Sequence, residues 1–314
     1  MKKRTLGASG LKVSLLGLGC NNFGGRIDTE ASREVIYKAL DLGITLFDTA
    51  DVYGNRGGSE TCLGQFLGDR RKDIILASKF GSPMDDAGTM RGGSRRYIMA
   101  AVDASLKRLK TDWIDLYQLH RPDPLTPAEE TLRALDDLVR QGKIRYIGCS
   151  SHAAWQVVGM QWTARHHGFS PLVSCEAEYS VLVRDPERDL VPAMRAYGIG
   201  LLPYYPLASG FLTGKYKRGA PLPKGARLTK GKRYSDKYLT DANWTLLERL
   251  EEFCKERGRS LLELAFGWLA AQPVVASVIA GATKVEQLEL NAKAVDWELA
   301  PQELAEIDRI TGKA

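Results

Sequence analysis

The amino-acid sequence predicts an α/β fold, a closed (β/α)8 TIM barrel formed by a single domain over residues 1–314. Short apolar runs alternate with segments of helical period, and each pair takes roughly 25–40 residues, as in right-handed β–α–β units. About eight such pairs fit the chain, which is the number that a closed barrel needs. An open nucleotide-binding sheet would instead carry a glycine fingerprint after its first strand. In GLGCNNFGG, Gly17 and Gly19 have the required spacing, but Asn22 occupies the position of the third glycine.

The expected strands are short apolar runs bounded by glycine or polar residues. In chain order they are SLLGLG (14–19), ITLFD (44–48), DIILASK (73–79), WIDLYQLH (113–120), IRYIGCS (144–150), LVSCE (172–176), GIGLLPY (198–204) and VASVIAG (275–281). Three additions to the barrel are expected. These are an N-terminal hairpin within residues 1–13, a long Gly/Pro/Lys-rich loop over 208–240 after strand 7, and an amphipathic C-terminal helix within 300–311.

Helix ends are marked by capping residues. Ser94 is expected to cap a helix that continues to residue 109. Thr126 and Glu129 have the spacing of a capping box at the start of the next helix, and Gly142 is expected to end it.

Composition and charge favour a soluble globular protein of the cytoplasm. The chain is 44% hydrophobic and 26% charged, and its net charge of +6 is compatible with an anionic ligand. The basic residues are scattered, with the densest cluster in the 224–237 loop, so no nucleic-acid partner is expected. The five cysteines include no C-x-x-C pair, which argues against a disulfide framework or a zinc knuckle. Neither a signal-peptide core nor ~20 successive apolar residues occur, so no membrane association is expected.

Reactive side chains stand where predicted strands end. Asp48, Lys79 and His120 end successive strands, and Tyr53 lies in the loop after Asp48. Barrel enzymes place their chemistry at the carboxyl ends of the strands, so these four side chains should meet. Each alone has an ordinary structural role, such as a turn-forming Asp or a packed Tyr. Their joint occurrence indicates a catalytic site.

The four residue types suggest proton transfer to a carbonyl oxygen. A phenol has a pKa of ~10, and an ammonium ~4 Å away favours phenolate by about 4 kcal/mol at an effective dielectric near 20. Lys79 is therefore expected to bring Tyr53 into a useful range, with Asp48 holding the lysine and His120 positioning the carbonyl. A phenol that protonates a carbonyl oxygen needs a reductant for the carbon, and hydride is the simplest one.

Longer motifs show a resemblance to a known family. GITLFDTADVYG, ILASKFG, IDLYQLHRPD, GKIRYIGCSS, PLASGFLTGKY and VIAGATKVEQLELN resemble those of the aldo-keto reductase superfamily, from about Arg4 to the end of the chain. The likeness is to bacterial and plant-type reductases and to potassium-channel β subunits. It implies NADP(H) as cofactor without a Rossmann domain. It also implies an Asp-Tyr-Lys-His tetrad at Asp48, Tyr53, Lys79 and His120, with Tyr53 as general acid.

The resemblance also implies where the cofactor lies. Residues matching the nicotinamide grip are Ser150, Ser151, Glu176 and Tyr204. Ser151 and Glu176 depart from the usual Asn and Gln; a carboxylate at Glu176 can accept a hydrogen bond but cannot donate one. Residues matching the pyrophosphate loop are Leu207, Ser209, Gly210, Leu212 and Lys215. Residues matching the adenosine end are Gly281, Ala282, Thr283, Lys284, Gln287 and Asn291.

The start of the last barrel helix is a suitable anion site. Thr283 and Glu286 have capping-box spacing, and a helix N-terminus attracts a phosphate group. Lys284 adds a charge that an NAD-only enzyme would not need, which favours NADP.

The substrate pocket is expected to involve the loops after several strands. Asn22, Phe23, Arg121 and Tyr205 are the candidates, and the substrate is expected to be a small carbonyl compound. Phe23 and Tyr205 either form an apolar opening or pack in the core. Arg121 meets either an anionic substrate or the neighbouring Asp123.

Two other functions remain open from the sequence. One is an NADP-bound regulatory or interaction module with weak or no turnover, like the channel β subunits. The other is a metal-dependent barrel hydrolase, which is disfavoured because only His120 among the histidines ends a strand. No metal is expected, and the sequence defines neither the particular aldehyde or ketone nor the oligomeric state.

Overall fold

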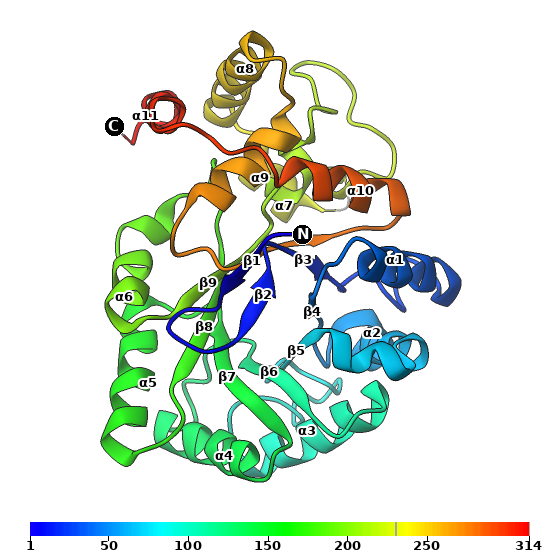
Figure 1. The fold of residues 1–314 in the computed structure, drawn as a ribbon, viewed down its shortest axis with the longest axis vertical. Helices are drawn as coiled ribbons and strands as arrows, with labels where there is room; N and C mark the ends of the chain where they lie inside the picture. Colours follow the sequence, from blue (N-terminus) through cyan, green and yellow to red (C-terminus); the bar gives the residue numbers. More distant parts are fainter. Residues whose placement is uncertain (230, 314) are drawn as a thin grey trace.

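Eight parallel strands form the barrel in a computed structural model that describes residues 1–229 and 231–313 (Figure 1). The strand order is β10-β3-β4-β5-β6-β7-β8-β9. Their bounds are β3 (Leu16–Gly19), β4 (Leu46–Asp48), β5 (Ile75–Phe80), β6 (Ile114–Leu119), β7 (Ile144–Ser150), β8 (Leu172–Glu178), β9 (Gly200–Tyr204) and β10 (Val278–Gly281). All eight expected strands are present, and the predicted TIM barrel is confirmed.

The barrel is nearly closed by contacts between β9 and the segment just before β10. Leu201 forms a parallel bridge with Val275. The Leu201 amide donates to the Val274 carbonyl at 2.8 Å, and the Ala276 amide donates to the Leu201 carbonyl at 3.0 Å. These bonds join the two ends of the sheet.

Helices surround the strands (Figure 1). Those that alternate with strands are α1 (Thr29–Asp41), α2 (Tyr53–Phe66), α3 (Arg95–Leu109), α4 (Ala128–Arg140), α5 (Ala154–His167), α6 (Leu190–Tyr197), α9 (Leu261–Ala271) and α10 (Val285–Ala294). Further helices are α7 (Lys232–Tyr238), α8 (Asp241–Glu256) and α11 (Pro301–Ile310), the last being the expected C-terminal helix. Short 3-10 helices are η1 (Gly68–Asp73), η2 (Asp185–Glu187), η3 (Ala208–Thr213) and η4 (Arg227–Thr229). The long loop expected over 208–240 follows β9 and contains η3, η4 and α7.

The N-terminal hairpin closes one end of the barrel. Its antiparallel strands are β1 (Lys3–Thr5) and β2 (Lys12–Ser14), close to the expected bounds. Apolar hairpin side chains pack against inward-facing strand residues in one buried cluster: Leu6, Leu11, Val13, Leu46, Ala77, Leu116, Leu202, Ala276 and Ile279. This apolar cluster fills the end of the barrel that lies opposite the carboxyl-terminal rim of the strands.

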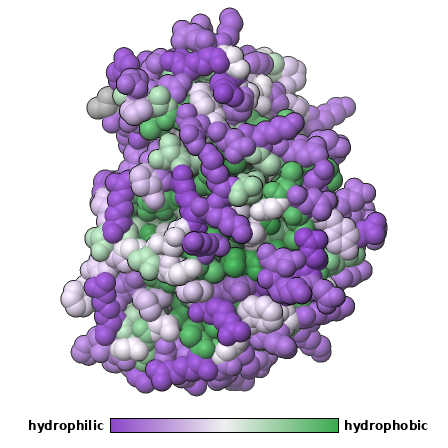
Figure 2. Space-filling model, viewed as in Figure 1, coloured by the Kyte–Doolittle hydropathy of each residue, from purple (hydrophilic) through white to green (hydrophobic). Residues whose placement is uncertain are grey.

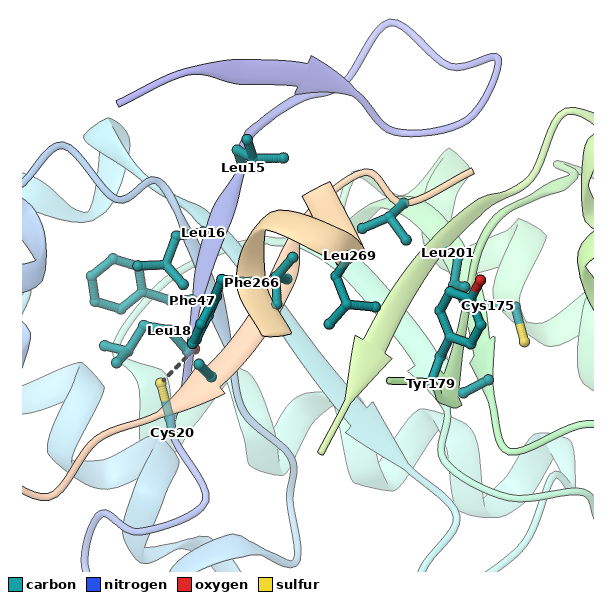
Figure 3. Close-up of a cluster of buried hydrophobic side chains, with 14 of the residues drawn as sticks. Leu15, Leu16, Leu18, Cys20, Phe47, Cys175, Tyr179, Leu201, Phe266 and Leu269 are labelled. Carbon is teal, nitrogen blue, oxygen red and sulfur yellow. Dashed lines mark hydrogen bonds between the residues drawn. The ribbon is translucent and has the colours of Figure 1, made fainter. Parts of the chain in front are cut away.

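A second core lies between the strands and the helices (Figure 3). Leu16, Leu18 and Phe47 pack there with Phe266 and Leu269 of α9. Figure 2 shows hydrophilic residues over the outer helices on one face, and hydrophobic residues mainly toward its centre. None of the described helices is long and apolar enough to cross a membrane.

Two of the three expected helix caps differ from the prediction. Ser94 caps α3 as expected, accepting a hydrogen bond from the Tyr97 amide. The predicted capping box at Thr126 is wrong, because its hydroxyl donates to Asp123 at 2.8 Å and α4 starts after Pro127 without a side-chain cap. The box expected from Thr283 and Glu286 is also wrong, because α10 begins only at residue 285.

All five cysteines are free and buried in the described chain. Gly142 adopts a φ of +75° just after α4, a left-handed conformation that favours glycine and turns the chain toward β7.

Candidate active site

The structure brings together the four residues that the sequence predicted to meet. Asp48 is the last residue of β4, and Lys79 is the penultimate residue of β5. His120 directly follows β6, and Tyr53 is the first residue of α2. Lys79 Nζ lies 2.6 and 2.7 Å from the two carboxylate oxygens of Asp48. The same nitrogen is 5.2 Å from the centre of the Tyr53 ring, which in turn packs edge-on against the His120 ring at 5.6 Å. One ammonium, one carboxylate, one phenol and one imidazole therefore share the carboxyl-terminal rim.

A tight turn after Tyr53 fixes where its ring points. Residues 54 to 57 all have positive φ angles, including +67° at Gly54 and +116° at Gly57. A Cβ at Gly54 would overlap the Phe23 carbonyl oxygen and lie 2.6 Å from the Ser59 amide nitrogen. Glycine is required there, because the backbone approaches the loop after β3 too closely for any side chain.

Lys79 is held in its charged form. Burial alone would lower the pKa of this completely buried ammonium, but the charge of Asp48, which is hydrogen-bonded to it, opposes burial, and the pKa lies above the ordinary value. Lys79 also donates to the Thr49 carbonyl at 3.1 Å, and Glu176 Oε1 lies 3.4 Å away. The ammonium is thus a fixed cation beside Tyr53.

The pKa of Tyr53 is raised, contrary to the expectation drawn from Lys79 alone. Burial is the main cause, and the charge of Asp48 adds to it. Lys79 does act toward a lower pKa, as expected, but loss of hydration of the phenolate outweighs it. Tyr53 therefore remains protonated at neutral pH, which is the form that a proton donor needs.

His120 is neutral at physiological pH. Burial lowers the pKa of its imidazole to about 3, with further contributions from Lys79 and Arg121. Its Nδ1 lies 3.2 Å from the Ser82 hydroxyl, which orients the ring. A neutral imidazole carries one N–H and can donate a hydrogen bond to a carbonyl oxygen without transferring a net charge.

A buried polar row crosses the floor of this site, and the sequence analysis did not predict it. Gln118 of β6 donates through Nε2 to Glu176 Oε1 of β8, and its Oε1 accepts from Ser174 at 2.9 Å. Gly148 of the intervening β7 makes room for it, because a Cβ there would overlap the Ser174 hydroxyl and lie 2.8 Å from Gln118 Oε1. The available signal was a lone glutamine inside an apolar strand.

The residues matched to the nicotinamide grip are neighbours. The Ser151 hydroxyl lies 3.4 Å from that of Ser150 and 3.3 Å from the Tyr204 hydroxyl. Ser151 has a φ of +62°, a conformation that asparagine adopts more readily than serine. Glu176 turns into the barrel toward Lys79, so it belongs to the tetrad's immediate surroundings as well.

The loop matched to the pyrophosphate has a shape that fits phosphate. Ser209 and Gly210 have φ angles of +58° and +95°, and the buried Ser209 hydroxyl forms no hydrogen bond within the described chain. A Cβ at Gly210 would come 3.4 Å from Lys215 Nζ. Leu207 directly precedes η3, and Leu212 lies within it. An orphaned hydroxyl, backbone without side chain and a nearby ammonium together match the needs of a bound phosphate.

Cations from two loops flank this segment. Burial and the charge of Arg227 lower the pKa of Arg26, and burial and the charge of Arg26 lower the pKa of Lys215. None of these three forms an ion pair with another described residue. Positive charge therefore gathers where the resemblance places the pyrophosphate.

The residues matched to the adenosine end surround the start of α10. Gly281 ends β10, Ala282 is buried, and Lys284 is the residue just before the helix. The Thr283 amide and hydroxyl both donate to Gln287 Oε1, at 2.9 and 3.1 Å. Gln287 therefore takes the capping role expected of Glu286. Asn291 lies further along the helix and is buried.

The expected substrate-pocket residues have different surroundings. Phe23 is completely buried in the main core, so it does not form an opening, and Asn22 is buried with its amide donating to the Ala282 carbonyl at 3.2 Å. Tyr205 is half-buried between Tyr204 and Tyr234, with Arg227 over its ring at 5.6 Å. These two aromatic positions thus separate into a core residue and a rim residue.

Arg121 is exposed beside His120 and forms no ion pair within residues 1–229 and 231–313. Asp123 is not its partner in the structure; the Asp123 carboxylate accepts instead from the Gly93 amide, the Leu125 amide and the Thr126 hydroxyl. No group of three or more metal-ligating side chains occurs in the described chain.

A closed barrel with a buried, charged cluster at the carboxyl ends of its strands is the architecture of a barrel enzyme. Comparison with known sequences places it within one family. The chain belongs to the aldo/keto reductase family, whose family model matches residues 15–311. The family generally uses NAD(P)H, and membership supports an oxidoreductase.

Relatives with known names are similar over nearly the whole chain. An uncharacterized oxidoreductase, YrpG, of Bacillus subtilis is 38% identical over 95% of this chain and 92% of its own length. An L-glyceraldehyde 3-phosphate reductase of Escherichia coli K12 is 37% identical over 98% and 92%. A probable voltage-gated potassium channel subunit beta of Arabidopsis thaliana is 38% identical over 94% and 92%.

Proposed function

We propose that this protein reduces an aldehyde or ketone to the alcohol with NADPH. The observation that carries the proposal is the buried contact of Lys79 with Asp48, beside the Tyr53 and His120 rings. In a family of oxidoreductases this arrangement has the parts needed to donate a proton to a carbonyl oxygen. When bound, NADPH supplies the hydride for the carbonyl carbon.

Each member of the tetrad has a separate task. Tyr53, protonated because burial raises its pKa, donates its proton to the oxygen as negative charge develops there. Lys79 stabilises the phenolate that remains, and Asp48 keeps the ammonium charged and in place. Neutral His120 orients the carbonyl oxygen by donating a hydrogen bond.

Residues of the chain would hold the cofactor in three places. Ser150, Ser151 and Glu176 would contact the carboxamide of the nicotinamide, with Tyr204 against the ring. The η3 loop, with Lys215, would hold the pyrophosphate. The start of α10 would hold the 2′-phosphate, because its free amides and Lys284 favour an anion.

The test is NADPH consumption with a panel of carbonyl compounds that includes a nitrobenzaldehyde. We expect the absorbance of NADPH to fall with the reactive aldehydes, and NADH to be used less well. Absence of both NADPH binding and NADPH consumption would overturn the proposal.

A phosphorylated substrate is supported by Arg121. This exposed guanidinium lies close enough to His120 to affect its pKa and has no acidic partner in the described chain. A relative is named as a reductase of L-glyceraldehyde 3-phosphate. We expect kcat/KM to be higher for glyceraldehyde 3-phosphate than for glyceraldehyde, and Arg121→Ala to remove about tenfold of that difference. Equal loss with both substrates would exclude a phosphate contact.

A regulatory module is the second candidate, because relatives of equal similarity are named as potassium channel β subunits. It predicts tight NADPH binding with negligible turnover across the panel. Turnover that Tyr53→Phe abolishes would favour the enzyme.

A further inference from the structure

Glu176 stands in the same buried space as Asp48 and Lys79. The three side chains are 3%, 5% and 0% exposed. Two potential anions therefore share one cation in a region without bulk water. This arrangement needs an explanation, since an uncompensated buried charge is costly.

The donors of Lys79 are already used by other groups. Its ammonium has three N–H groups, and its short contacts are with the two Asp48 oxygens and the Thr49 carbonyl at 2.6, 2.7 and 3.1 Å. Glu176 Oε1 is 3.4 Å away, longer than an ordinary N–H···O bond. The ion pair is thus with Asp48, and Glu176 lies beside it.

The other contacts of Glu176 suit a neutral acid. Its Oε1 accepts from the Gln118 amide, which is a neutral donor. One ammonium can neutralise only one of the two carboxylates. Because Asp48 makes the bidentate contact with it, Glu176 is the carboxyl group left without a close counter-ion, and keeping its proton avoids a buried charge.

Among the residues that the structure describes, no second cation lies near enough to neutralise an ionised Glu176. The titratable groups that face it are Asp48 from β4, Lys79 from β5, Tyr53 from α2 and Cys149 from β7. Burial raises the pKa of Glu176 well above its ordinary value, and the charge of Asp48 adds to this while Lys79 opposes it. The contacts of Glu176 and the charges around it thus both favour a protonated side chain.

We infer that Glu176 is a neutral carboxylic acid that positions the catalytic cluster and acts there as a hydrogen-bond donor, in place of the usual glutamine amide. A protonated Glu176 could donate a hydrogen bond, whereas the sequence analysis expected it only to accept. The catalytic role inferred for Glu176 rests on the proposed function. With the proton, the sum of charges on Asp48, Lys79 and Glu176 is zero. Without it, a net negative charge opposes the phenolate that Tyr53 must form when it donates.

The direct test is infrared spectroscopy of the protein without substrate or cofactor. Asp51 is also partly protonated at pH 7, so the measurement is made with Asp51→Asn in every protein compared. In that background we expect a carbonyl-stretch band of a protonated carboxylic acid at pH 7 that Glu176→Gln removes. The matched control is Glu178→Gln, two residues along β8, where the carboxylate contacts Lys237 and Tyr238; it should keep the band. No band at pH 7, or a band that survives in Glu176→Gln, would overturn the inference.

This measurement needs no activity, so its failure is separate from failure of the proposed function. If Glu176→Gln does not fold, the band can still be followed in Asp51→Asn as the pH is raised, and its loss before pH 7 is reached would contradict the inference.

The pH profile of kcat/KM tests whether Glu176 has a positioning role. We expect kcat/KM of Glu176→Gln to stay within about threefold of wild type at pH 7, because both side chains are neutral there. At alkaline pH wild type should fall by about tenfold or more as Glu176 ionises, while Glu176→Gln should not. Identical profiles for the two proteins would exclude the role.

Discussion

Glu176 Oε1 lies 3.4 Å from Lys79 Nζ, in a space where the ammonium is already paired with Asp48. This relationship joins a residue matched to the cofactor grip with a residue of the tetrad. It makes the proton affinity of Tyr53 depend on two carboxyl groups instead of one. Non-additive effects of substitutions are the expected result.

Substitution of both carboxyl groups tests this dependence. In Asp48→Asn, Glu176 can release its proton and become the counter-ion of Lys79, so we expect a loss of about 1–2 kcal/mol in the free energy of unfolding. Asp48→Asn combined with Glu176→Gln leaves Lys79 without any carboxylate and should cost about 3–5 kcal/mol. Urea unfolding measures both, and Asp48→Asn with Glu178→Gln is the matched control. Simple additivity of the two substitutions would contradict the shared-counter-ion interpretation.

Asp51 provides a pH test outside the tetrad. Burial and the nearby Glu60 raise its pKa from 3.8 to about 7, and only one of its oxygens has a partner, the Tyr97 hydroxyl. Between these values the folded state binds the proton and the unfolded state does not, so stability falls as pH rises from about 4 to 7. Asp51→Asn should therefore be more stable than wild type at pH 8, on the order of 2 kcal/mol, with no gain near pH 4.

Asp123 is the control, because its pKa is lowered and the dependence of stability on pH should have the opposite sign. Burial raises its pKa, but hydrogen bonds from Gly93, Thr126 and Leu125 outweigh this and lower it overall. Asp123→Asn should destabilise the protein at neutral pH and less so in acid. Urea midpoints at pH 4 and pH 8 decide both signs, and a loss in Asp51→Asn at pH 8 would show that its charge is stabilising.

His120 should not titrate in the physiological range. Because burial lowers its pKa to about 3, its ring signals in NMR should stay constant from pH 5 to 8. In urea the same ring should titrate near ~6.5. His120→Gln, which keeps a neutral donor, should lower kcat by about tenfold, and His120→Ala by about 100-fold. An imidazole that gains a proton near pH 6 in the folded protein would contradict a neutral donor.

Lys284 should select NADPH. Because it precedes α10 and adds positive charge to that helix N-terminus, Lys284→Ala should raise KM for NADPH by about tenfold and leave KM for NADH nearly unchanged. Lys293→Ala, in the last turn of the same helix, is the control and should change neither. A proportional rise for both cofactors would place the 2′-phosphate elsewhere.

Much of the fold could be predicted because it depends on local patterns. Apolar runs and glycine boundaries define the strands, and consecutive parallel strands must bring Asp48, Lys79 and His120 to one rim. The contact between Gln118 and Glu176 could not be predicted in this way, since it depends on register across three strands and on the missing side chain of Gly148.

Burial explains the remaining differences. The sequence shows that Lys79 is a cation near Tyr53, but not how much water the fold removes from the phenol, so the direction of its pKa was missed. Phe23 in the core and Gln287 at the start of α10 likewise depend on three-dimensional packing. Local spacing assigned the capping role at α10 to Glu286, and it made Phe23 a candidate for the substrate pocket.

The measurement that tests the central claim most directly is NADPH oxidation by Tyr53→Phe, compared with wild type at neutral pH on a reactive aldehyde. The phenylalanine keeps the ring between Lys79 and His120 but has no proton to donate. We predict that kcat falls by at least about 100-fold while the Kd for NADPH, measured by fluorescence, changes little. Full turnover by Tyr53→Phe would contradict the assignment of this residue as the proton donor.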